Sequence, residues 1–132
     1  MKFLSLIFFL VFSSNTVMAG GGGGGSASTP FIPLNPPIIV NLMDGKYVRH
    51  MQVNIEIKLV DPKNAPKIDL HKGPLRHELI LLLSSQEAGT ISSAQGKEQL
   101  RKDALAAVQK VMQELEGDPI IESLYFTNFV IQ

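Results

Sequence analysis

An alternating stretch from Lys46 to Val60 constrains this fold more than any other feature of the sequence. Apolar residues fill most of one side of it: Tyr47, Met51, Val53, Ile55, Ile57 and Leu59. Arg49 interrupts that side. The opposite side is polar: His50, Gln52, Asn54, Glu56 and Lys58. A period of two over this length predicts a long β-strand with one face on a core and the other in water.

Turn signals bound this strand at both ends. Ile38–Leu42 predicts a short buried strand before it, and Asp44-Gly45 predicts a hairpin, because both of these residues tolerate positive φ. From Asp61 to Pro66, two prolines and an asparagine prevent the strand from continuing.

Two helices are predicted next. Gly73-Pro74 opens the first, since proline suits the first helical position. Its apolar stripe is Leu75, Leu79, Ile80, Leu82 and Leu83. Residues 84–91 are predicted as a break with Gly89 as its pivot.

The second helix is predicted to be long and amphipathic. Ser92 or Ser93 caps its start, it runs to about Glu116, and Gly117 is suited to end it. Apolar residues repeat along it at intervals of three and four: Leu100, Ala104, Leu105, Val108, Val111, Met112 and Leu115.

The last strand is predicted over Ile120 to Gln132. Strict alternation places apolar residues on both of its faces, so we expect it to be central or covered on both sides. In this reading Phe126 and Phe129 point to opposite faces. Truncating either to alanine would cost about 3–5 kcal/mol if the ring were fully buried.

The element order β–β–α–α–β predicts an α+β domain. A mixed or antiparallel sheet would be covered on one face by helices, including the long amphipathic one.

The N-terminal segment predicts export. A short positive start, an apolar run and Val17-Met18-Ala19 are typical of a signal peptide over residues 1–19. The alternative is a short uncleaved membrane anchor. Residues 20–37 are rich in glycine and then proline and are predicted as a linker, which leaves residues 38–132 as the folded domain.

Composition excludes several functions. The 132 residues contain 12 basic and 12 acidic side chains, so a nucleic-acid partner is not expected. Cysteine is absent, which excludes disulfides and thiolate metal sites. No nucleophile–base pair or phosphate loop is evident, and His50, His71 and His77 lack the spacing of metal ligands. We therefore expect no enzyme, metal, cofactor or small-molecule substrate.

Four segments resemble the family of the flagellar basal-body protein FliL. They are residues 38–42 (IIVNL), 51–59 (MQVNIEIKL), 75–103 and the terminal 121–132 (IESLYFTNFVIQ). The resemblance covers residues 31–132. The structural motif residues that it implies are Asn41, Gly96, Tyr125, Phe126, Phe129 and Gln132. Gly96 is expected to allow close packing at the start of the long helix.

The resemblance implies a stomatin-like (SPFH-like) domain in the periplasm and a non-enzymatic role. The family assembles in rings around the stator units of the flagellar motor and supports torque, swarming or rotational control. The implied partners are the linker of a MotB-type stator subunit and other FliL-family protomers. Members generally carry a full transmembrane helix, from which this N-terminus departs. The alternative function is a periplasmic stomatin-like scaffold that is not associated with the flagellum.

Overall fold

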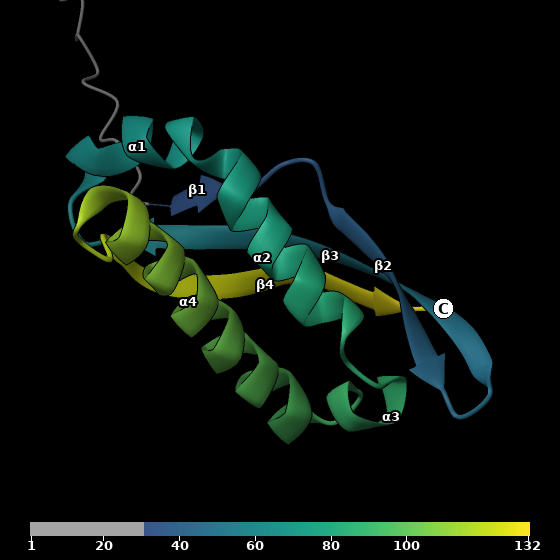
Figure 1. Ribbon diagram of the computed structural model, residues 1–132. Coiled ribbons are helices and arrows are strands. Elements are labelled where there is room, and N and C mark those ends of the chain that lie inside the picture. Colours follow the sequence, from purple (N-terminus) through teal and green to yellow (C-terminus); the bar gives the residue numbers. More distant parts are fainter. Residues whose placement is uncertain (1–30) are drawn as a thin grey trace, which may run out of the picture.

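The computed structural model describes residues 31–132 of the chain (Figure 1). The elements follow in this order: β1 (Phe31–Pro33), β2 (Ile38–Asp44), β3 (Tyr47–Leu59), the 3-10 turn η1 (Pro62–Asn64), α1 (Ala65–Leu70), α2 (Lys72–Ser84), α3 (Ala88–Ile91), α4 (Ala94–Glu116) and β4 (Ile121–Ile131). Among these residues, no helix is both long enough and apolar enough to cross a bilayer.

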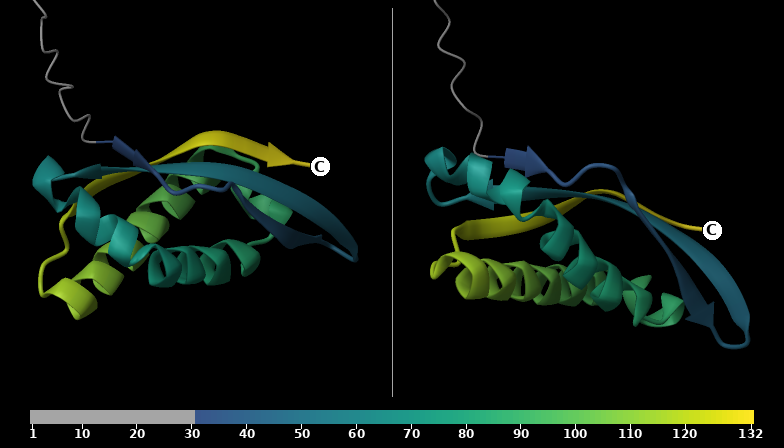
Figure 2. Two further views of the ribbon diagram at one scale, coloured as in Figure 1. Left: turned by 90° about the horizontal axis from the view of Figure 1, so that it is seen from above. Right: turned by 45° about the horizontal axis from the view of Figure 1, so that its top comes forward.

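β3 is the central strand, and every strand pairing is antiparallel. β1 and β2 lie along one of its edges and β4 along the other. The helices cover one face of this sheet, and the opposite face carries no helical layer (Figure 2). An α+β domain with an antiparallel sheet under helices is therefore confirmed.

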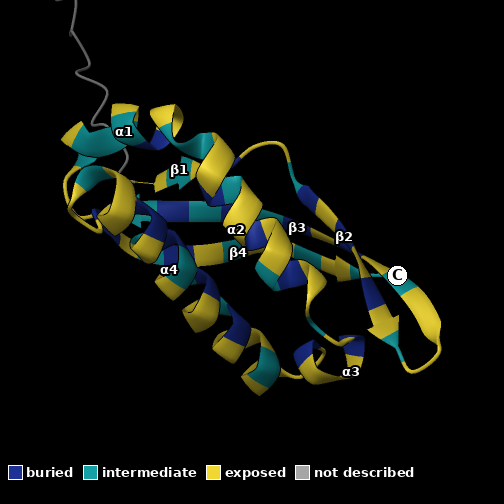
Figure 3. Ribbon diagram, viewed as in Figure 1, coloured by how far each residue is buried: buried dark blue, intermediate teal, exposed yellow. Residues whose placement is uncertain are grey.

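The predicted alternation of β3 places its core face correctly. Alternate residues from Met51 to Leu59 are buried against the helices, together with Leu75, Leu79 and Val108. Tyr47 is the exception, because its side chain is 68% exposed in the hairpin, which extends beyond the helices (Figures 2 and 3).

The hairpin is confirmed, with its turn one residue later than predicted. Asp44 pairs with Tyr47, so Gly45-Lys46 forms the turn and Gly45 supplies the positive φ of 61°.

The fold begins before the predicted boundary at residue 38. β1 pairs with Glu56–Lys58, and the Leu34 side chain behind it is only 2% exposed. Part of the predicted linker thus belongs to the sheet, because prolines are accommodated in a short edge strand. The predicted signal peptide or anchor, and the glycine-rich part of the linker, lie outside the described residues.

The helical region differs from the prediction in two places. Residues after Asp61 form η1 and α1, because Asp61 caps the turn and Pro66 lies in the first turn of a helix rather than in a loop. Gly89 is part of the short helix α3 and not the pivot of an irregular break. α4 has the predicted bounds: the Ser93 side chain accepts from the Gly96 N–H, and Gly117 ends the helix with a φ of 75°.

β4 is an edge strand with helices on one face only (Figure 2), so the prediction that it is central or covered on both sides was wrong. Two irregularities in its pairing with β3 explain why its sequence is misleading. Asn128 pairs with Asn54 and Phe126 with Ile55, which leaves Thr127 as an extra residue in a β-bulge. Glu122 is extra in the same way between Ile121 and Ser123.

Each bulge resets the alternation of β4. The apolar residues that now share the helix-facing side, and are buried or partly buried there, are Ile121, Leu124, Phe126, Phe129 and Ile131. Phe126 and Phe129 therefore lie on the same face and not on opposite faces. One covered face accounts for most of the apolar residues of the strand.

Gly96→Ala is expected to destabilise the domain by about 1–3 kcal/mol. A Cβ at this position would lie 1.9 Å from the backbone oxygen of Thr90, so the α3–α4 connection would have to shift. Gly89→Ala is the matched control, because a Cβ there would meet no atom within 4 Å. Chemical denaturation of both variants tests this, and equal stabilities would contradict it.

Glu116→Gln is expected to remove a pH-dependent part of the stability. The hydrogen bond from His71 lowers the pKa of Glu116, with a further contribution from Lys67 and partial opposition from desolvation. A lowered folded-state pKa stabilises the fold above the ordinary glutamate pKa, and this stability is lost as pH falls through the folded-state value.

The difference in unfolding free energy between wild type and Glu116→Gln should therefore shrink from about pH 6 to about pH 3. Glu114→Gln, on the exposed side of the same helix turn, controls for the loss of one charge. A difference that stays constant with pH would refute the assignment.

Candidate functional site

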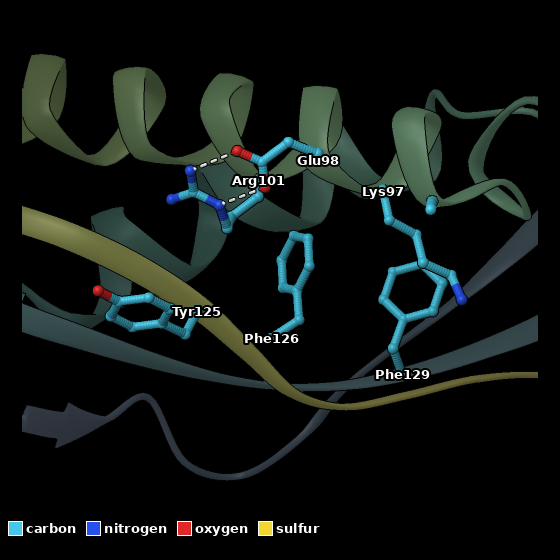
Figure 4. Close-up of a pocket in the computed structure, with 7 residues that line it drawn as sticks. Lys97, Glu98, Arg101, Tyr125, Phe126 and Phe129 are labelled. Carbon is cyan, nitrogen blue, oxygen red and sulfur yellow. Dashed lines mark hydrogen bonds and ion pairs between the residues drawn. The ribbon is translucent and has the colours of Figure 1, made fainter.

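An open groove lies between the first half of α4 and the second half of β4 (Figure 4). Its volume is about 360 Å³. It is lined by Ala94, Lys97, Glu98, Arg101, Tyr125, Phe126 and Phe129. The groove exists at this end because α4 and β4 diverge from one another toward the start of the helix (Figure 1).

Two aromatic rings form the floor of the groove. The centroids of Phe126 and Phe129 are 5.6 Å apart, with ring planes tilted by 49°. Both point from β4 toward α4 (Figure 4), and both are only partly buried. The bulge at Thr127 creates this pair, because regular alternation would have separated the rings.

Lys97 supplies a cation at one end of the groove. Its Nζ lies 5.1 Å from the centre of the Phe129 ring, within the range of a cation–π interaction. Among residues 31–132, no carboxylate forms an ion pair with Lys97. The ammonium group is thus available to a negatively charged ligand.

Glu98 and Arg101 neutralise each other at the other end. The guanidinium donates two hydrogen bonds to the carboxylate, of 2.8 Å and 2.7 Å. This contact lowers the pKa of Glu98 and raises the pKa of Arg101. Arg101 also donates to the backbone oxygen of Leu124 at 3.2 Å, which fixes the helix to the strand.

The lining residues suit ligand binding rather than catalysis. They include no hydroxyl or thiol nucleophile with an adjacent base, and the one acid is held ionised by Arg101. An apolar floor with a cation beside it recognises a ligand that carries apolar and acidic groups.

Three of the predicted motif residues line this groove: Tyr125, Phe126 and Phe129. Gly96 lies next to it in the first turn of α4, packed against Thr90. Tyr125 lies at its rim, and its ring contacts Phe31 at a centroid distance of 6.1 Å.

The other two predicted residues, Asn41 and Gln132, lie outside the groove. Both contact His50 on β3. The Asn41 Oδ1 is 2.7 Å from the His50 Nδ1. The backbones of Gln132 and His50 exchange two hydrogen bonds, so the β3–β4 ladder extends to Gln132.

Sequence reasoning did not find Lys97, Glu98 and Arg101 as site residues. Lys97 and Arg101 fall outside the apolar positions of the predicted long helix, so the sequence pattern places them on its solvated face, which is the ordinary place for such residues. A signal does exist: Phe126 and Phe129 are three residues apart, and a bulge between them would aim both at the helix.

The fold and the groove define a class: a small α+β domain with an open groove between α4 and β4. Residues 31–132 match the family described as flagellar basal body-associated protein FliL, and the chain belongs to this family. The family is one of flagellar accessory proteins associated with the basal body and is not a known enzyme family. The match does not favour a scaffold outside the flagellum.

A relative from Aquifex aeolicus (strain VF5), named Flagellar protein FliL, is 28% identical to the chain over 99 residues. The match covers 75% of this chain and 59% of that protein. The matched region therefore spans less than two thirds of the relative's length.

Phe129→Ala and Phe126→Ala are each expected to cost about 1–2.5 kcal/mol, roughly half the value for a fully buried ring, because both rings are only partly buried. Val130→Ala, on the opposite face of β4, is the control and should cost under about 1 kcal/mol. Urea denaturation measures all three. If each phenylalanine variant lost the about 3–5 kcal/mol of a fully buried ring, the groove would be closed in solution.

Proposed function

We propose that this protein is a non-enzymatic accessory of the flagellar motor that assembles near or around the stator units and supports torque, swarming or rotational control. The observation that carries the proposal is the family match, which includes every residue of the domain. The groove supports the proposal as well, because its lining residues can contact a ligand and include no nucleophile with an adjacent base.

The outer face of the sheet supports an assembling role. No helix covers this face (Figure 2), and several large apolar side chains are exposed on the strands. Ile39 is 66% exposed, and Met43 and Val48 are paired across the β2–β3 hairpin. Apolar side chains exposed on a sheet face without a helical layer suit protein–protein contacts.

The proposed partners are other FliL-family protomers and the linker of a MotB-type stator subunit. The proposed location is the periplasm at the basal body, with the N-terminal segment either removed on export or retained as a membrane anchor. A stomatin-like arrangement of the domain, which the sequence resemblance implies, is part of the same proposal.

Deletion of the gene tests the function in motile cells. We expect reduced swimming in soft agar and a larger deficit in viscous medium, because the loss concerns torque under load. Restoration by the wild-type gene in trans and an unchanged number of filaments are the controls. Normal motility at high load, with diffuse rather than basal-body fluorescence of a tagged chain, would refute the proposal.

A further inference from the structure

The free edge of β4 has two halves that differ in hydrogen bonding. Side chains of α4 cover the first half: Gln109 donates to the backbone oxygen of Ile121 at 2.9 Å, and Arg101 donates to that of Leu124 at 3.2 Å. These bonds satisfy strand groups that would otherwise be available to another chain.

The second half has no such cover. Gln132 and His50 exchange both backbone hydrogen bonds, so the alternation of an antiparallel ladder turns the backbone groups of Phe129 and Ile131 away from β3. Within residues 31–132, no hydrogen bond reaches the N–H or C=O groups of these two residues on that side. The segment from Tyr125 to Ile131 also carries no lysine, proline or acidic residue to block pairing.

The uncovered edge borders the groove. Phe126 and Phe129 present their rings to it, and Lys97 lies beside Phe129 with no carboxylate partner among the described residues (Figure 4). Unpaired strand groups, an apolar floor and an unpaired cation thus meet at one place. Backbone pairing gives affinity at such a site, and alternate side chains give selectivity.

We propose that the open half of β4 receives an extended segment of another protein, which adds to the sheet as a further strand and places an acidic side chain beside Lys97. A second copy of this chain fits less well. Two β4 edges paired with each other would bring no carboxylate from the paired strands beside Lys97, because residues 125–131 contain no aspartate or glutamate. The inference deepens the proposed function, since a motor partner would supply the segment.

Peptide binding to the full chain tests the inference independently of motility. The probe is a synthetic peptide of about eight residues in which valine and threonine alternate and aspartate replaces one central valine. We expect the amides of Phe129 and Ile131 to exchange rapidly in the free chain. Saturating peptide should slow this exchange by about tenfold or more. A peptide N-methylated at every central residue should give no protection, because it has no N–H to donate to β4 from either edge.

Charge reversal tests the role of Lys97. The aspartate peptide should bind about three- to fivefold more tightly than the same peptide with lysine, and Lys97→Glu should reverse this order. Lys110→Glu makes the same charge change on an exposed part of α4 and should leave the order unchanged.

Absence of protection at Phe129 and Ile131, or no dependence on Lys97, overturns the inference even if deletion of the gene impairs motility. Protection of these amides in a dimer without peptide also overturns it, in favour of a second copy. Sedimentation at several concentrations detects that dimer.

Discussion

The domain depends on the central position of β3. This strand pairs with every other strand, and its apolar face from Met51 to Leu59 provides the surface on which α2 and α4 pack. No disulfide can reinforce it, because the chain has no cysteine. The burial of apolar side chains between one sheet and one helical layer must therefore supply most of the folding free energy. It also leaves the other face of the sheet without a helical layer, free to meet solvent or partners (Figure 2).

The parts of the fold that follow from local pattern could be predicted. The period of β3, the caps of α4 at Ser93 and Gly117, and the hairpin at Gly45 each depend on residues within one element. Bulges could not be predicted, because an extra residue is defined only by its pairing partner. As a result, β4 appeared to be apolar on both faces, and Phe126 and Phe129 were assigned to opposite faces. β1 and α1 were missed for a related reason. Proline was interpreted as excluding regular structure, although it can lie in an edge strand or in the first turn of a helix.

The groove illustrates how function can depend on two elements that a sequence does not visibly connect. Lys97 and Arg101 are ordinary residues of a solvated helix face until β4 is placed beneath them. Arg101 then takes a structural role, because it neutralises Glu98 and donates to Leu124, while Lys97 remains without an ion-pair partner among the described residues. Two cations one helical turn apart therefore have different roles, and only the arrangement of the strand distinguishes them.

The bulge at Thr127 determines which face of the sheet each later side chain of β4 takes. If the strand paired regularly with Thr127 in place, Phe129 and Ile131 would turn toward solvent and Val130 would lie under the helix. Deleting Thr127 would instead remove the bulge and leave Phe129 opposite Val53, on the helix side. Insertion or deletion of a paired residue in this strand should consequently be far less tolerated than deletion or substitution of Thr127, which has no pairing partner in β3 and an exposed side chain. The number of paired residues along the strand sets the face on which each side chain lies, and a shift of one residue exchanges the two faces.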